Sequence, residues 1–487
     1  MLPDRGYVYV VRVHRTFLTI AGLALVFQPA LAQVAPSSLP VGTIIPSVVC
    51  SADNKQSYAL YLPSNFSGTR PWPIIYVFDP TARGQVAVET IKLAAEKFGY
   101  IVVASNNSRN GPMGGSAQAM KAMWQDTHQR FPIAEQRRYV AGMSGGARVA
   151  TSFALSCQGC IVGVIANAAG FPFGAEPTRN MKFAYYAAVG NADFNYGEFV
   201  DLRRKLDAAG ARYRIRIFEG QHGWAPPEVW TEALNWMDMQ AMSAGTMPRD
   251  PSRIQQTFAS ALAKAREYQS QNNLLYALRE YQSLARDFRG LAAASSAETA
   301  LAERAKSKAV KTAEKEEASA LDQQAQITSS LSSQMQAIAT SDRYQIDVAD
   351  LKSNIADLKK RADAARSPND LKTLVLRRAL GQLVIEAYES GQRSLDEKNH
   401  RAAVVYFDLV AAGSANPAWA HYQRARAYAM LADKKNTLAE LRVSLAGGFH
   451  EASALEAAEF QAFQGQPEFQ ALAAEWKLAA EKEKEKP

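Results

Sequence analysis

The sequence predicts a chain in two structural parts: an α/β domain with a mostly parallel sheet, then an all-α region. Up to about residue 245, short runs of β-branched and aromatic residues alternate with amphipathic segments and with Gly, Pro and Asn turns. This alternation predicts strands covered by helices. Beyond that point Pro and Gly become scarce and helix-forming residues dominate. A chain of 487 residues is also too long for one core, since domains usually hold about 100–200 residues.

Residues 1–32 have the features of a signal peptide. A positive n-region containing three Arg precedes the apolar run Phe17–Phe27, and Ala30–Ala32 fits a small-residue cleavage site. The apolar run is short compared with the roughly 20 residues that a membrane-spanning helix needs. We therefore expect an exported protein, periplasmic or secreted, with no integral membrane segment after cleavage.

Residues 46–245 form the predicted α/β domain. Buried parallel strands should be nearly continuous apolar runs, and residues 161–166 are such a run. The predicted strands are Ser57–Leu62, Pro73–Phe78, Ile101–Ala104, Arg138–Ala141, Ile161–Asn167, Phe183–Val189 and Arg212–Phe218. The predicted helices are Ala87–Lys97, Gly115–Arg130, Gly145–Ser156, Tyr196–Ala209 and Pro227–Ala241.

The all-α region contains a pattern that repeats every 34 residues, which is the period of a tetratricopeptide helix pair. Thr437 and Leu441 depart from the usual residues of that repeat, and a generic helical bundle with the same period is the alternative. The later repeats and capping helices are expected over 386–480, and an earlier helix pair over 250–290. Gly391, Ser394, Phe407 and Val410 are followed 34 residues later by Ala425, Tyr428, Leu441 and Ser444, and the earlier pair has Ala265, Tyr268, Ala277, Tyr281 and Leu284.

The polar stretch 291–385 is predicted to form a long antiparallel helical hairpin. One apolar seam contains Leu331, Met335 and Ile338, and a second runs from Val348 to Leu358. Such narrow stripes are typical of helices that pack along one face. The turn is expected at 341–342, between the two seams.

Charge and cysteine content argue against several functions. The net charge of +8 is spread along the chain, without a basic block interleaved with aromatics, so nucleic-acid binding has little support. Cys157 and Cys160 have no second ligand pair, so no metal site is predicted. In an oxidising compartment they could bond to each other, or Cys50 could bond to one of them.

A serine between two glycines is the strongest chemical signal. Ser144 lies in Gly142–Gly146, directly after a predicted strand and at the start of a predicted helix. A nucleophile on such a tight strand-to-helix turn needs small neighbours, since the backbone is strained. The helix N-terminus and the Gly145 amide would then face the developing oxyanion.

A serine nucleophile needs a base, and the base needs an acid to orient it. His222 lies in a Gly-flanked loop after the last predicted strand, whereas His128 falls inside a helix and the remaining His lie in the signal segment or the all-α region. Asp193 follows the preceding strand; a helix N-cap is its structural alternative, and Glu198 is a weaker choice of acid. The order Ser144, Asp193, His222 then predicts a catalytic triad.

With these residues, 46–245 resembles the α/β-hydrolase fold, and is most similar to small secreted esterases of the dienelactone-hydrolase, feruloyl-esterase and polyhydroxyalkanoate-depolymerase kind. The resemblance implies a second oxyanion amide in a loop after an early strand, commonly led by His-Gly. The equivalent loop here, Phe78–Gly84, lacks that dipeptide. The amide of Thr81 or Ala82 is the expected donor, while Asp79 is expected to stabilise the loop.

Substrate contacts are expected from polar and aromatic residues near the strand ends. Asn107 and Arg109 lie in a polar stretch after a strand and could bind substrate hydroxyls or carboxylates, or form a plain turn. Phe194 and Trp224 could line the mouth of the site or simply pack. Residues 168–182 leave no room for a lid domain, so an open site is expected.

The predicted function is hydrolysis of a carboxylic ester of unknown size through an acyl-enzyme, without metal or organic cofactor. A serine peptidase on the same fold is one alternative. An inactive scaffold built on the helical repeats is another, because such repeats usually bind a protein partner or recruit a substrate. The all-α region is expected to be separable from catalysis.

Overall fold

The structure is a computed structural model, and it describes residues 39–291, 295–340, 348–365, 367, 369–451 and 453–484. The predicted signal peptide and the turn at 341–342 lie outside these ranges. Within them, no helix is both long and apolar enough to cross a membrane.

The first part of the chain builds one eight-stranded sheet in the order β1-β2-β4-β3-β5-β6-β7-β8. β2 is antiparallel to both β1 and β4, and every pairing from β4 to β8 is parallel. The strands are β1 (Ile44–Val49), β2 (Ser57–Tyr61), β3 (Trp72–Phe78), β4 (Ile101–Ser105), β5 (Ile133–Met143), β6 (Gly163–Asn167), β7 (Ala184–Gly190) and β8 (Tyr213–Phe218).

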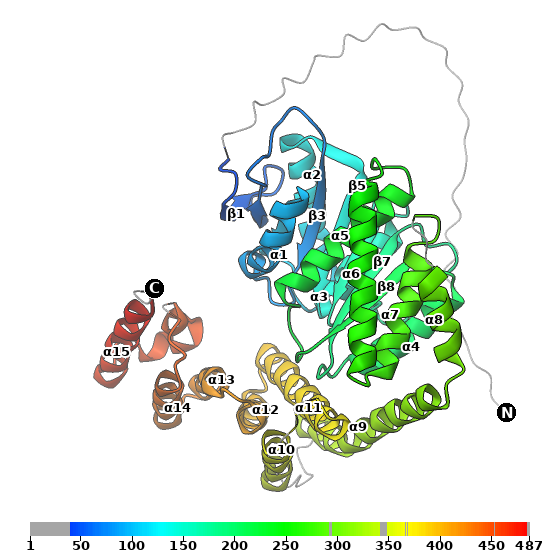
Figure 1. Cartoon of the computed structure of the whole chain (residues 1–487). Coiled ribbons are helices and arrows are strands. Elements are labelled where there is room, and N and C mark those ends of the chain that lie inside the picture. The colour runs from blue at the N-terminus through cyan, green and yellow to red at the C-terminus, as the bar shows by residue number, and fades with distance from the viewer. Residues whose placement is uncertain are drawn as a thin grey trace, which may run out of the picture.

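Helices cover both faces of this sheet (Figure 1). α1 (Gly84–Phe98) and α5 (Pro227–Ser243) pack on one face. α2 (Met113–Arg130), α3 (Gly145–Ser156) and α4 (Tyr196–Ala208) pack on the other. The strand order, the parallel pairings and the two helical layers confirm the predicted fold class, an α/β-hydrolase fold followed by helices.

β1 is a strand that the sequence analysis did not predict. It lies at the sheet edge, contains Pro46, and has an irregular register between Ile45 and Val48. Three of its six residues are exposed, so β1 lacks the apolar pattern of a buried strand. Proline and a bulge are both tolerated at an edge, where one side of the strand has no ladder to maintain.

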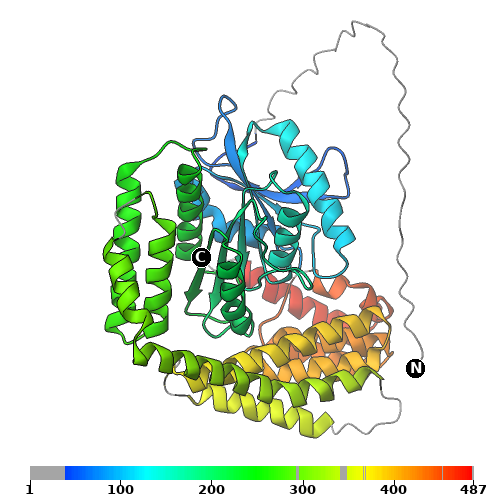
Figure 2. The same cartoon turned by 90° about the vertical axis from the view of Figure 1, so that its right-hand side faces the viewer.

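The second part is helical and wraps around the sheet domain (Figure 2). α6, α7 and α8 stand beside it, and α9 and α11 run beneath it. The helices are α6 (Pro251–Ser270), α7 (Leu274–Asp287), α8 (Ser295–Ala305), α9 (Lys308–Thr340), α10 (Val348–Asp363), α11 (Leu371–Asp396), α12 (His400–Gly413), α13 (Ala418–Met430), α14 (Lys434–Ala446) and α15 (Pro467–Lys484), with short 3-10 helices at Ala454–Glu456 and Ala458–Phe463.

The helix that lies alongside α9 is α11, whereas the predicted hairpin paired α9 with the next helix, α10. Side-chain hydrogen bonds join Gln324 to Gln382 and Ser332 to Glu386, so α9 and α11 run side by side in the same direction. α10 packs on α11 and α12, and its seam shares one core with Met335 of α9. The apolar stripes were predictable, but the helix that would cover each one was not.

The helix pairs α11/α12 and α13/α14 are the ones that carry the 34-residue pattern. Gly391 lies against the ring of Phe407, where an added Cβ would come within 2.8 Å of the ring. Ala425 and Leu441, the corresponding residues of the next pair, are fully buried. The assignment of these pairs to the tetratricopeptide family stays a prediction.

The two parts share buried contacts. Met239 and Met242 at the end of α5 belong to the same apolar core as Ile254, Phe258 and Tyr281 of α6 and α7. A buried ionic cluster adds to it, in which Arg214 of β8 pairs with Glu280 and Asp287 of α7 and with Glu232 of α5. Each part therefore buries surface that the other would leave exposed.

Candidate active site

Ser144 occupies the turn between β5 and α3 in a strained conformation, with φ 54° and ψ −125°. Positive φ is uncommon for a residue with a Cβ and is tolerated only where the surroundings fix it. The flanking glycines allow the turn to be tight. A Cβ on Gly142 would lie 2.3 Å from the Gly146 carbonyl, and one on Gly146 would lie 2.0 Å from the Phe78 carbonyl oxygen.

The side chains of His222 and Asp193 meet Ser144 at the carboxyl ends of the parallel strands. His222 Nε2 lies 2.9 Å from Ser144 Oγ. His222 Nδ1 lies 3.0 Å from each carboxylate oxygen of Asp193. Asp193 is fully buried, while Ser144 and His222 are half-buried. The structure therefore brings the three predicted residues within hydrogen-bond distance, in the arrangement of nucleophile, base and orienting acid.

Two buried asparagines hold the loops that carry these residues. Asn167, at the end of β6, accepts from the Ser144 amide through its carbonyl oxygen at 2.8 Å, and from the Ala225 amide through its side chain at 2.7 Å. Asn191 begins the acid loop, residues 191–195, and its side chain accepts from the Gly220 amide at 3.1 Å. Neither residue was singled out in the sequence, because a polar residue at a strand end has no pattern that marks its partner.

Of the three amides predicted to donate to an oxyanion, only that of Gly145 is without a hydrogen-bond acceptor in its own loop or helix. Gly145 is the first residue of α3, so its amide has no acceptor within the helix and lies beside Ser144. The amides of Thr81 and Ala82 already donate inside their own loop, to Oδ1 of Asp79 at 2.8 Å and to its carbonyl oxygen at 3.2 Å. In this conformation neither of them is free to stabilise an oxyanion.

Asp79 is the centre of that loop. Its buried carboxylate accepts from Thr81, from Arg83 and from the indole nitrogen of Trp224, the last at 3.0 Å. Burial alone would raise the pKa of Asp79, but the hydrogen bonds from Arg83 and Thr81 outweigh it and hold this pKa below its usual value. The predicted structural role of Asp79 agrees with these contacts.

The predicted substrate-binding residues have different positions. The side chain of Asn107 accepts from the Ser57 amide and donates to the Lys55 carbonyl, which agrees with the alternative of a plain turn and not with substrate binding. Arg109 is exposed, and its backbone pairs with Thr81. Trp224 is half-buried and packs on Trp230 at a ring distance of 5.8 Å, besides bonding to Asp79.

Phe194 lies directly beside the base. Its ring centroid is 4.3 Å from that of His222, and the two planes are tilted by 32°.

The two alternative triad residues make other contacts: Glu198 makes a two-point ion pair with Arg148, and His128 stacks on Trp124.

The helical region borders the site, a neighbour that the expectation of an open site did not include, and the two residues that meet there, Asn110 and Glu389, are both exposed. Asn110 lies over Gly145, since a Cβ on that glycine would fall 1.9 Å from its Oδ1 atom. The Asn110 side chain donates to Glu389 of α11 at 3.3 Å. On the other side, a Cβ on Gly381 of α11 would lie 3.7 Å from the Phe194 ring. This neighbour is not a lid inserted between two strands, because α11 comes from later in the chain.

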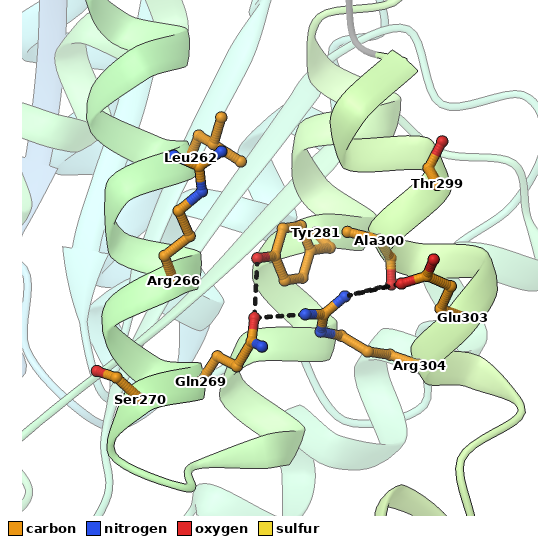
Figure 3. A pocket seen from close by; sticks show the side chains of 9 residues that line it. All are labelled: Leu262, Arg266, Gln269, Ser270, Tyr281, Thr299, Ala300, Glu303 and Arg304. Atoms are coloured by element: carbon orange, nitrogen blue, oxygen red, sulfur yellow. Dashed lines mark hydrogen bonds and ion pairs between the residues drawn. The ribbon is translucent and has the colours of Figure 1, made fainter.

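A hollow of about 720 Å³ lies elsewhere, among α6, α7 and α8 (Figure 3). Gln269 bridges Tyr281 and Arg304 across it. No member of the triad lines this hollow, so it does not belong to the site described above.

The three cysteines form one disulfide and leave one free thiol. Cys157 and Cys160 form a disulfide, and Cys50 is a buried free thiol whose pKa is raised by burial to about 12. Among the described residues, no group of three or more His, Cys, Asp or Glu side chains could hold a metal ion.

Comparisons with known proteins give no family assignment. No protein-family model and no curated protein matches the chain. Solved structures match it in part. A feruloyl esterase module from Clostridium thermocellum is 14% identical, with a TM-score of 0.32 over 38% of this chain and 83% of that one. An esterase from Pyrobaculum calidifontis is 11% identical, with a TM-score of 0.35 over 42% and 87%. An S-formylglutathione hydrolase from Staphylococcus aureus is 15% identical, with a TM-score of 0.30 over 37% and 90%.

Proposed function

We propose that this chain is a serine hydrolase that cleaves carboxylic esters. One observation carries the proposal: the continuous line of hydrogen bonds from Ser144 Oγ through His222 to the buried carboxylate of Asp193, with Ser144 on a strained turn at the N-terminus of α3. A strained backbone conformation costs about 1–3 kcal/mol and is found mainly at functional sites, where the surrounding structure holds it.

The reaction follows from these positions. His222 takes the Ser144 proton as Oγ attacks the ester carbonyl carbon, and Asp193 holds the imidazole and stabilises its charged form. The Gly145 amide and the N-terminus of α3 stabilise the tetrahedral oxyanion. His222 then gives its proton to the leaving alkoxide, and water, activated by the same histidine, releases the acid from the acyl-enzyme.

Export and recruitment are part of the same proposal. The features of residues 1–32 support export to the periplasm or the medium. The Cys157–Cys160 disulfide supports it too, because such bonds persist mainly in oxidising compartments. The helical pairs from α11 onward are proposed to bind a protein partner or a large ester, as repeat arrays commonly do.

Labelling with a fluorophosphonate tests the nucleophile on the intact protein. Trypsin cuts after Arg138 and Arg148, and the peptide between them contains Ser144 as its single serine. We expect the label on this peptide in the folded protein and none after heat denaturation, because the hydroxyl is reactive only beside its base. Mass spectrometry of the digest measures it.

The substrate class is tested on the same preparation with p-nitrophenyl esters of increasing acyl length, aromatic esters and matched anilides. Hydrolysis of esters with little cleavage of anilides supports the proposal. Equal or faster anilide cleavage would favour a peptidase instead. No label and no hydrolysis of either kind would leave an inactive scaffold as the better description.

A further inference from the structure

The helical region holds the acid loop on both sides of Asp193. Arg378 Nε, from α11, donates to the carbonyl oxygen of Asn191 at 2.7 Å. Gln324 Nε2, from α9, donates to the carbonyl oxygen of Phe194 at 3.1 Å. Figure 2 shows α9 and α11 running together beneath the sheet. Side chains from far along the sequence therefore fix the backbone just before and just after the acid.

Arg378 is an unusual residue in its surroundings. Its side chain is 1% exposed, its guanidinium lies 3.7 Å from the centre of the Tyr196 ring, and none of the described carboxylates forms an ion pair with it. Its Nη1 atom has no hydrogen-bond partner within the described part of the chain. Burying a charge without an ion pair is costly, so its presence at this loop calls for a role.

The acid loop borders a cavity on the side that faces the helical region. The cavity has a volume of about 550 Å³ and is lined by Asn191, Tyr196, Asn369 and Arg378 among others. The Asn191 side chain reaches across to Asn369, just before α11, with a hydrogen bond of 3.0 Å. On this side, the hydrogen bonds with Asn369 and Arg378 are the contacts that hold Asn191.

Asn191 also joins the acid loop to the loop that carries His222. Its side-chain oxygen accepts from the Gly220 amide, and the carbonyl of Gly220 accepts from the Ala192 amide at 2.9 Å. Gly220 lies two residues before His222, so the loop of the acid and the loop of the base are joined at the residue that Arg378 holds.

We infer that Arg378 is a positioning residue for the catalytic acid and base, contributed to the active site by the helical region. It acts through Asn191 and touches no substrate. The inference rests on the proposed function, because it concerns the same triad. A misplacement of about 1 Å in catalytic groups can lower the rate about 100-fold, so loss of this support should appear in the chemical step.

Kinetics of Arg378→Met on p-nitrophenyl acetate test the inference with the full-length protein. Methionine keeps part of the apolar bulk and removes the charge and the donor. We expect kcat to fall about 30-fold, equal to about 2 kcal/mol in the barrier, with KM within threefold of wild type. Arg378→Lys keeps the charge and one donor, and should restore kcat to within about fivefold of wild type. Fluorophosphonate labelling should slow in parallel.

Arg393→Met provides the matched control, since Arg393 is an exposed arginine on the same helix. It should leave kcat and KM unchanged. If Arg378→Met lowers only the melting temperature and keeps wild-type kcat at 25 °C, Arg378 is merely structural and the inference is overturned. A wild-type protein that neither hydrolyses esters nor takes the label would refute the proposed function instead.

A second variant covers the case in which Arg378→Met does not fold. Asn369 is exposed and precedes α11, so Asn369→Ala should fold normally while removing the bond to Asn191. It should lower kcat about three- to tenfold with KM unchanged. An unchanged kcat in this variant would also contradict the inference.

Discussion

Replacing Ser144 with alanine is expected to lower kcat for a small ester by about 10⁶-fold, the size of the loss seen when a serine nucleophile is removed. The attacking oxygen is lost, while His222 and Asp193 stay in place. The melting temperature should hardly change, because alanine also carries a Cβ at the same positive φ and small substitutions of this kind usually cost within about 0.5 kcal/mol. Steady-state kinetics and thermal unfolding of the pure protein measure the two effects.

Ser156→Ala is the matched control for this variant. Ser156 ends α3, the helix that Ser144 precedes, and it is exposed with its hydroxyl bonded to the Ser152 carbonyl oxygen. It should keep wild-type kcat. A Ser144→Ala protein retaining more than a tenth of wild-type kcat would show that another group performs the attack.

Arg214→Met should destabilise the fold more than any other substitution considered above. Arg214 is buried and pairs with Glu280, Asp287 and Glu232. Its removal leaves two almost fully buried carboxylates without their main cation, and breaking such a cluster costs about 3–5 kcal/mol. The midpoint of urea unfolding should fall accordingly, with Arg204→Met, at an exposed arginine, close to wild type.

The loss in Arg214→Met should depend on pH. Burial already raises the pKa of Glu280 above its usual value, against the lowering effect of Arg214. Without Arg214 the folded protein would bind this proton still more tightly than the unfolded chain, so stability rises as the pH falls. The variant should therefore be closer to wild type at pH 5 than at pH 8. An equal deficit at both values would exclude Glu280 as the source of the destabilisation.

Features that depend on local patterns were predictable from the sequence. Ser144 stands out because strand, glycines and helix follow one another within a few residues. Asp193 and His222 then follow from the chain order that this fold imposes on strand-end loops. The sheet strands other than β1 are marked by their apolar runs, whereas β1 is an exposed edge interrupted by Pro46.

Features that depend on tertiary contacts were not predictable. Within the polar stretch after β4, Asn107 turns toward β2 while Asn110 turns toward Gly145, and nothing in the residue types distinguishes the two. The amides of Thr81 and Ala82 were good candidates by position, but Asp79 folds their loop back on itself. The contact between Arg378 and Asn191 joins two segments whose sequences carry no shared signal.

That contact also sets the order in which the molecule can become active. Asn191 and Arg378 are 187 positions apart, and contacts of such long range form late, since the chain must first bring its distant segments together. During synthesis the sheet emerges well before α11. We expect ester hydrolysis to recover after the helical and sheet signals of circular dichroism when the unfolded protein is returned to native conditions. Simultaneous recovery of the two would mean that the sheet domain assembles its site unaided.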